Sequence, residues 1–593
     1  MNAEQVRERY AGRVKALETR KAEAENAAAS SGLLMVGLGV AAIASIYFAI
    51  QGALNWWLAT APLPLLAFAV RRFNASRDEV GRLARVFRWY ERAMQRLDGD
   101  WVGVGAAGDR FEETEHPYAG DLNLFGEGSL FQLVCSARTT IGELGLAKYL
   151  KEPVSLEESR LRQEAVLELR EMYELRESVV AMGRFESFES RWETFIEWLE
   201  LPPIEFHPML RVGMMATVSI LVLLVAAGGL KLLSWEAVAR FAVPVLGIQA
   251  MVGLQFRDRI SQMQSWLGSV SIEAEVLRDG LELLEKQNFQ SAKLQGLVAR
   301  VKGSGAAVRR LEQLLAAMSE RNKDWFYVPS LVLVLGTQLM IAIETWRARN
   351  QAALPDWLAA WGEFEALQSL ATYAFENSDN VMPELIAGEI ALRATAIGHP
   401  LLPLESCVRN DITFDASTRL YIISGSNMSG KSTLLRAIGI NSVLAFAGAP
   451  VRAASLQVSA LSVCASLSIA DSLLNGKSKF MSEMDRLRIM IERARAGDAV
   501  LFLVDEIMSG TNSRDRRVAT EAVVKTLLQH GAIGALSTHD LALTEIATAE
   551  LHGVNVHMCS KGNGDPLDFD YTLKPGVTTE SNAMAIARLA GVA

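Results

Sequence analysis

The residue types best suited to chemistry occur in a glycine-rich loop that follows a short apolar run at residues 420–423. The N–H groups of a glycine-rich backbone can turn toward phosphate oxygens, and the N-terminus of a following helix adds partial positive charge. A helical pattern does follow this loop, so the segment predicts a strand, a phosphate-binding loop and a helix. The predicted nucleotide-binding residues are Gly425, Ser426, Asn427, Met428, Ser429, Gly430, Lys431, Ser432 and Thr433.

Two side chains of this loop have expected roles toward ATP and Mg²⁺. Lys431 is expected to reach the β and γ phosphates, and the Ser432 hydroxyl is expected to ligate Mg²⁺. A second apolar run, at 500–504, ends in Asp505 and Glu506. In a hydrolysing enzyme of this kind, Asp505 would hold the Mg²⁺ shell and Glu506 would polarise the attacking water.

A third apolar run, at 533–536, leads to Thr538 and His539. The carboxyl ends of parallel strands meet at one crevice, so His539 is expected to point at the nucleotide and sense the γ-phosphate. The alternative is a structural histidine. Taken together, the three strand ends predict a C-terminal α/β P-loop ATPase domain with Glu506, His539 and Lys431 as its catalytic residues.

The same segments resemble the MutS family of DNA mismatch-repair ATPases. The likeness lies in the Asn-Met pair of the loop, in residues 476–484, in the run 505–513 and in Thr538-His539. Weaker likeness covers residues 128–169. The resemblance implies a homodimer with composite sites, in which Ser478 contacts the γ-phosphate bound by the other subunit, and it implies DNA as a ligand.

The sequence also departs from the family pattern. Apolar segments stand where a mismatch-reading domain would precede the helical core, and Lys479 replaces the usual threonine. Cys407 aligns where family members often place an aromatic residue for adenine, so the sequence leaves the choice of base open.

Composition sets limits on the class of protein. Half of the 593 residues are hydrophobic and the formal charge is -9, which excludes a disordered or fibrous chain and gives no generic attraction to nucleic acid. Four separated cysteines indicate neither a zinc site nor a disulfide framework.

Many of the hydrophobic residues lie in two pairs of uninterrupted apolar segments. Residues 33–50 and 53–70 are uncharged and flank Gln51 and Gly52, and each segment is just long enough for a bilayer. Basic residues before the first run and after the second predict a transmembrane hairpin with both ends in the cytoplasm. Two buried core helices are the alternative.

A second pair, at 212–230 and 241–256, predicts another hairpin, although Pro244 weakens its second segment. The run at 328–343 is read as a buried helix, because a further crossing would separate the ATP site from the cytoplasm. These readings predict a multi-pass protein of the cell membrane with a cytoplasmic ATPase domain.

The remaining chain up to about residue 400 is predicted to be helical, with a capped helix over 155–176 and long packed helices over 272–318. Residues 271–325 hold nine basic and eight acidic side chains and no basic stripe, so no basic patch supports DNA binding. The expected order is a basic tail (1–30), hairpin 1 (31–72), helical core (73–205), hairpin 2 (206–257), arm and second core part (258–390) and ATPase domain (391–593).

Two functions fit these observations. The first is a membrane-anchored MutS-like ATPase that moves helical arms on mismatched or branched DNA. The alternative is an ATP-driven interaction switch on a protein or lipid partner. A transporter of the ABC kind fits less well, because the spans carry almost no polar residues for a substrate path.

Overall fold

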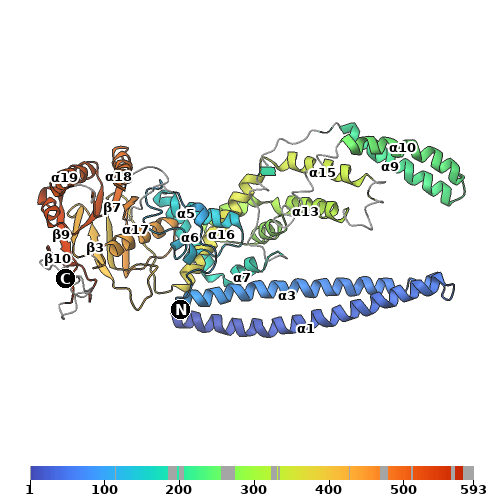
Figure 1. Ribbon diagram of the computed structural model, residues 1–593, viewed down its shortest axis with the longest axis horizontal. Coiled ribbons are helices and arrows are strands. Elements are labelled where there is room, and N and C mark those ends of the chain that lie inside the picture. Colours follow the sequence, from blue (N-terminus) through green and yellow to red (C-terminus); the bar gives the residue numbers. More distant parts are fainter. Residues whose placement is uncertain are drawn as a thin grey trace.

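Figure 1 shows an elongated molecule with its β-sheets at one end, a helical core in the middle and two helical hairpins reaching toward the other end. The predicted mixed α/β region at the C-terminal side and the helical region before it are both confirmed. The computed structural model describes residues 2–113, 115–183, 197–198, 206, 208–255, 274–321, 330, 334–426, 428–467, 479–508, 512–561 and 568–578.

The first hairpin consists of α1 (Ala3–Ile50) and α3 (Pro62–Asp98), which lie side by side along their length. Asn2 caps α1, because its side chain accepts from the Gln5 backbone while the Gln5 side chain accepts from the Asn2 backbone. The base of the hairpin packs on α7 (Tyr173–Ala181). The apolar side chains of this root cluster are Val6, Tyr10, Leu17, Leu83, Val86, Trp89, Tyr90, Ala93, Val180 and Phe375.

The tip of this hairpin differs from the expected pair of uninterrupted spans. The predicted turn at Gln51 and Gly52 is observed, but residues 53–70 are divided between α2 (Trp56–Ala59) and the start of α3. The physical reason is Pro62, because proline lacks an N–H donor and favours the first turn of a new helix. The prediction of one continuous span over 53–70 is therefore wrong.

The second hairpin contains α9 (Pro208–Gly229) and α10 (Trp235–Gln255), and Pro244 lies inside α10. Both helices begin a few residues before the predicted spans. Within the described residues, three helices are long and apolar enough to cross a bilayer: α1, α9 and α10.

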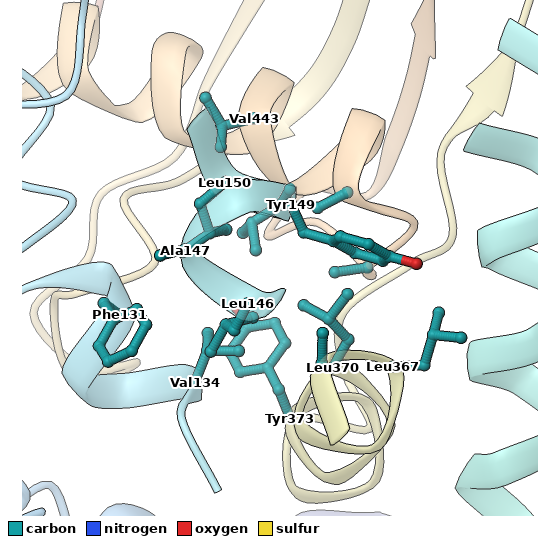
Figure 2. Close-up of a cluster of buried hydrophobic side chains, with 14 of the residues drawn as sticks. Phe131, Val134, Leu146, Ala147, Tyr149, Leu150, Leu367, Leu370, Tyr373 and Val443 are labelled. Carbon is teal, nitrogen blue, oxygen red and sulfur yellow. The ribbon is translucent and has the colours of Figure 1, made fainter. Parts of the chain in front are cut away.

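The helical core is built around α16 (Leu354–Glu376), which packs against α5 (Thr140–Lys151) and α6 (Leu156–Glu171). Figure 2 shows side chains of α4 (Leu130–Val134), α5, α16 and α17 (Lys431–Ala447) meeting in this core. A Cβ added at Gly145 would lie 2.3 Å from the Gly362 carbonyl oxygen, so α5 and α16 touch backbone to backbone.

Two predictions for the helical region have mixed outcomes. Ser155 caps α6 as expected, but the helix predicted over 155–176 ends at Glu171 and resumes as α7 after Met172. Long packed helices do follow, as residues 274–285, α12 (Ala292–Val301) and α13 (Ser304–Arg321). Then comes α15 (Leu335–Asn350), where Met340, Ile341 and Ile343 are buried as expected for the run at 328–343. Residues 328–329 and 331–333 lie outside the described residues.

Two sheets form the C-terminal domain. The four-stranded sheet has the order β1 (Glu384–Leu385), β5 (Ser455–Val458), β2 (Leu392–Ile397) and β3 (Asn410–Phe414). The six-stranded sheet has the order β10 (Lys574–Pro575), β9 (Gly553–His557), β4 (Leu420–Ser424), β8 (Ile533–Thr538), β7 (Val500–Asp505) and β6 (Ser462–Ser466). Sheet pairing thus begins at β1, ahead of the expected domain start at residue 391.

The six-stranded sheet positions the candidate site. Every neighbouring pair from β9 to β6 is parallel, and only β10 is antiparallel. The helical core packs on one face of this sheet together with α17, and α18 (Lys479–Arg495) and α19 (Ser513–Gln529) pack on the other face. Figure 1 shows these helices on different sides of the sheet. Ser424 lies opposite Thr538, and Asp505 lies opposite Ser537. The carboxyl ends of β4, β8 and β7 therefore form one aligned edge.

Candidate active site

The glycine-rich loop joins β4 to α17 and has two positions that require glycine. Gly425 has φ 154°, and a Cβ there would lie 2.6 Å from the Met558 carbonyl oxygen. Gly430 has φ 98° and precedes the first residue of α17. These conformations are open to glycine and costly for other residues, so the loop can turn its backbone as a phosphate cradle requires.

Lys431 lies at the centre of this loop. Its Nζ donates to the carbonyl oxygens of Gly425 at 2.9 Å and Ser426 at 2.8 Å. Burial lowers the pKa of the ammonium group, and the carboxylates of Asp505 and Glu506 oppose that change. A cation that costs free energy to bury and faces the loop interior is well placed to bind an anion.

Asp505 joins the three strand ends. Its carboxylate accepts from the hydroxyl groups of Ser432 and Ser537. Ser432 lies in the first turn of α17 and Ser537 lies on β8, so the contact brings the P-loop, β7 and β8 together. A hydroxyl and a carboxylate in contact are the two protein oxygen ligands that Mg²⁺ takes from a nucleotide site of this kind.

Glu506 and His539 form a pair beside this contact. The His539 Nδ1 atom lies 3.0 Å from the Glu506 Oε1 atom. Glu506 has φ 49°, a sparsely populated conformation for a residue with a side chain, and its N–H donates to the Ser537 carbonyl oxygen at 3.1 Å. Strained backbone of this kind is often found where a side chain must take one working position.

A pocket of about 610 Å³ opens next to these residues, within the range of small-molecule sites. Most of the predicted residues line it: Met428, Ser429, Gly430, Lys431, Ser432, Thr433, Asp505 and Glu506. The carbonyl oxygens of Gly425 and Ser426 accept hydrogen bonds from Lys431. His539 contacts the carboxylate of Glu506, which lines the pocket. Asn427 and Ser478 lie outside the described residues.

Tyr571 and His399 also line this pocket, and neither was among the predicted site residues, although His399-Pro400 resembles the family's entry to the ATPase domain. Asn410 holds Tyr571, because its Nδ2 donates to the Tyr571 carbonyl oxygen at 3.1 Å. Burial, then the charges of Arg436 and Arg452, lower the pKa of His399 to about 4, so this ring is neutral near pH 7. Rings that line a pocket beside a predicted phosphate-binding loop can stack on a nucleobase. Cys407 instead contacts the His399 backbone.

Comparisons with known proteins agree with this geometry. The family model described as MutS domain V matches residues 421–593. The DNA mismatch repair protein MutS of Lactobacillus delbrueckii subsp. bulgaricus is 26% identical over 510 residues, which are 79% of this chain and 58% of that protein. The DNA mismatch repair protein MutS 1 of Halobacterium salinarum is 31% identical over 302 residues, which are 49% of this chain and 34% of that protein. The chain therefore spans less than two thirds of either relative.

Proposed function

This chain belongs to the MutS family, and on that premise we propose that it is a membrane-anchored ATP hydrolase whose helical arms move with ATP binding and hydrolysis. One observation carries the proposal. Lys431, Ser432, Asp505 and Glu506 line one pocket at the aligned edge of a parallel sheet. This is the edge at which α/β sheets bind ligands.

The residues at this edge have separate roles in binding and hydrolysing ATP. Lys431 binds the phosphates, the turned backbone of the loop orients them, and Glu506 draws a proton from the attacking water while His539 holds its carboxylate. Ser432 and Asp505 are the residues that would hold Mg²⁺. When bound, Mg²⁺ supplies positive charge against the phosphate oxygens.

By the same family relation, we infer a homodimer. Ser478 would act across the subunit interface on the γ-phosphate, which makes each site composite. The part of the chain around Ser478 lies outside the described residues, so this assignment rests on the resemblance alone.

The inference of membrane anchoring rests on the surfaces of the hairpins. In the second hairpin Leu223 is 68% exposed, whereas Gln249 is 3% exposed and donates to the Thr217 hydroxyl at 3.1 Å. Apolar side chains outside and a hydrogen-bonded polar pair inside reverse the pattern of a water-soluble helix pair. Both hairpin tips point to the same end of the molecule, away from the sheets (Figure 1).

Tryptophans support the same inference. Trp56 and Trp57 lie near the tip of the first hairpin and Trp235 lies near the tip of the second, and all three are exposed. Tryptophan gathers at membrane–water interfaces because its ring is apolar and its N–H is polar. We infer that these tips reach the outer interface of the cell membrane, with the ATPase domain in the cytoplasm.

Cysteine labelling tests this topology. Cysteines placed at Gln51 and Ser234 should react with an impermeant thiol reagent added to sealed cells, because both residues lie at hairpin tips. A cysteine at Ser417, on an exposed turn of the ATPase domain, is the matched control and should react only after lysis. Reaction of the Ser417 position in sealed cells would contradict the topology.

The ligand of the arms is the second part of the proposal. Both relatives are named DNA mismatch repair proteins, and we infer DNA, mismatched or branched, as the ligand. The net charge of -9 gives no generic attraction to DNA. The alternative function, a switch acting on a protein or lipid partner at the membrane, is favoured by the two apolar hairpins.

A titration separates the two functions. The detergent-solubilised protein should bind paired, mismatched and four-way-junction DNA weakly and with little preference among them. The affinity should fall steeply with salt, since phosphate contacts release counterions. Binding is measured by fluorescence anisotropy in ADP and in ATP. A mismatch preference of about tenfold or more, about 1.4 kcal/mol, would restore an ordinary repair role, and absence of binding to all three would favour the switch.

A further inference from the structure

A short segment of the helical core passes along the edge of the six-stranded sheet. This edge segment spans residues 117–124 and precedes α4. The Pro117 carbonyl oxygen accepts from the Ala465 backbone N–H at 2.9 Å, so the segment continues the sheet beyond β6, the last strand in its order. The Tyr118 hydroxyl donates to the last two carbonyl oxygens of α5, at 3.0 and 2.7 Å. The edge segment therefore joins the helical core to the sheet.

The edge segment also packs on α17, the helix that follows the glycine-rich loop. A Cβ added at Gly439 of α17 would lie 2.6 Å from Leu122 and 3.1 Å from Leu503 of β7. Leu122 and Leu503 thus lie directly against the backbone of α17. The main-chain carbonyl oxygen of Asp121 accepts from the Arg436 Nε atom at 3.0 Å. These contacts fix the edge segment to α17 through packing and through its main chain.

The side chain of Asp121 has a different partner. Asp121 is only 1% exposed. Its Oδ1 atom accepts from the Leu467 backbone N–H at 2.8 Å, directly after β6. Its Oδ2 atom forms an ion pair with Arg486 of α18. Asp121 therefore contacts α17 through its main chain and α18 through its carboxylate, and so touches the two helices that pack on opposite faces of the sheet.

Helix α18 carries this contact to the end of β7. Glu483 lies three residues before Arg486, is buried, and accepts from the backbone N–H of Met508. Residues three apart share a helix face, so the position of Arg486 also sets that of Glu483. Met508 follows Glu506 by two residues, and their φ values are 54° and 49°. Strained backbone of this kind persists only where its surroundings hold it, and Glu483 supplies one such contact.

We propose that Asp121 is a positioning residue for ATP hydrolysis: through α18 it holds the backbone that carries Glu506 in its working position. The inference rests on the proposed role of Glu506 in hydrolysis. Because Asp121 belongs to the helical core, the rate of hydrolysis depends on how the core lies against the ATPase domain. Binding of ATP depends on the glycine-rich loop and Lys431, so Asp121 acts on turnover and not on binding.

Asp121→Asn is the test variant, because it removes the charge that faces Arg486 and little else. Asparagine keeps the size of the side chain, an oxygen that can accept from Leu467, and the main-chain carbonyl bonded to Arg436. Full-length protein in detergent is assayed for kcat by phosphate release and for Kd with labelled ATP. The value of kcat should fall by about tenfold or more, because a misplaced base is a poor one, whereas Kd should change by less than about twofold.

Variants of α18 provide the comparison and the control. Arg486→Gln should lower kcat as Asp121→Asn does, and Arg486→Lys should recover part of the rate because lysine keeps the charge. Arg488→Gln is the matched control, since Arg488 lies on the same helix, is 61% exposed and pairs with Glu492 at 3.0 Å. It should leave kcat and Kd unchanged. If Asp121→Asn protein does not fold, the two Arg486 variants test the same contact.

A double variant separates positioning from a general loss of stability. If Asp121 acts through Glu506, Asp121→Asn should cost little further activity in the Glu506→Gln protein, where the side chain to be positioned has already lost its function. Residual hydrolysis is measured in single turnovers with labelled ATP. An equal further loss in the Glu506→Gln background would overturn the proposal, and so would a wild-type kcat in both Asp121→Asn and Arg486→Gln proteins.

Hydrogen exchange tests the same contact without turnover. Asp121→Asn should speed exchange in the peptide that contains the Met508 N–H, because the hydrogen bond to Glu483 is held less firmly. Arg488→Gln should leave this exchange unchanged. A wild-type protein that hydrolyses no ATP would contradict the proposed function, yet faster exchange in Asp121→Asn would still support the link through α18. Exchange at Met508 that is the same in wild-type and Asp121→Asn proteins would overturn it.

Discussion

Glu506→Gln should leave ATP binding intact and lower the rate of ATP hydrolysis by a factor on the order of 10² or more. The amide keeps the size of the side chain but cannot take a proton from water. Binding contacts at Lys431 and in the loop are unchanged, so the variant should hold ATP without turning it over. The rate is measured as phosphate release and the binding as retention of labelled ATP.

Lys431→Ala is the informative partner of this variant, because it should lose ATP binding itself. If the sites are composite, Glu506→Gln protein should also accumulate as an ATP-bound dimer, visible by light scattering in detergent, whereas Lys431→Ala protein should not. Turnover by the Glu506→Gln variant at the wild-type rate would remove Glu506 from the reaction.

Glu376→Ala should reduce the stability of the protein by about 3–5 kcal/mol, because it leaves a buried arginine without its carboxylate. Arg96 and Glu376 join α3 to the end of α16, with side chains 11% and 2% exposed. Loss of the pair should appear as a lower melting temperature in detergent and as earlier proteolysis of α3.

An exposed ion pair between α1 and α3 provides the control. Arg7 and Asp98 pair at 2.8 Å near the surface, and Asp98→Ala should cost less than about 1 kcal/mol. Replacing both Arg96 and Glu376 by methionine should recover much of the stability lost in Glu376→Ala, because no buried charge is left alone. A Glu376→Ala protein that melts at the wild-type temperature would mean that the pair carries no net stability.

The residues of the candidate site could be selected from the sequence because they are local in the chain. A strand, a glycine loop and a helix follow each other directly, and the apolar runs that end at Asp505 and Thr538 are typical of buried parallel strands. The structure places the ends of these runs in one aligned edge. Tyr571 was not predictable, because it lies more than a hundred residues after the loop in a segment without periodic pattern.

Other features could not be predicted from the sequence, for different reasons. The division of residues 53–70 depends on where Pro62 begins a helix, and hydropathy alone does not detect this. The helical spacing of Arg85, Arg88, Arg92 and Arg96 in α3 can be read from the sequence, but spacing does not tell whether a helix face meets solvent or the core. That required the loop at Trp101 and the α4–α5 connection, which the chain brings back against α3 only in the folded protein.

The continuous length of α1 has a mechanical consequence. At 1.5 Å per residue, its 48 residues extend about 72 Å, and α3 braces it from the root cluster outward. A rotation of about 10° at the root of a rod of this length moves its far end by about 13 Å. The same ratio works in reverse, so a sideways load at the far end acts on the Arg96–Glu376 contact with a long moment arm. On the proposed arm movement, a small angular change at α16 would accompany a large translation at the apolar tip.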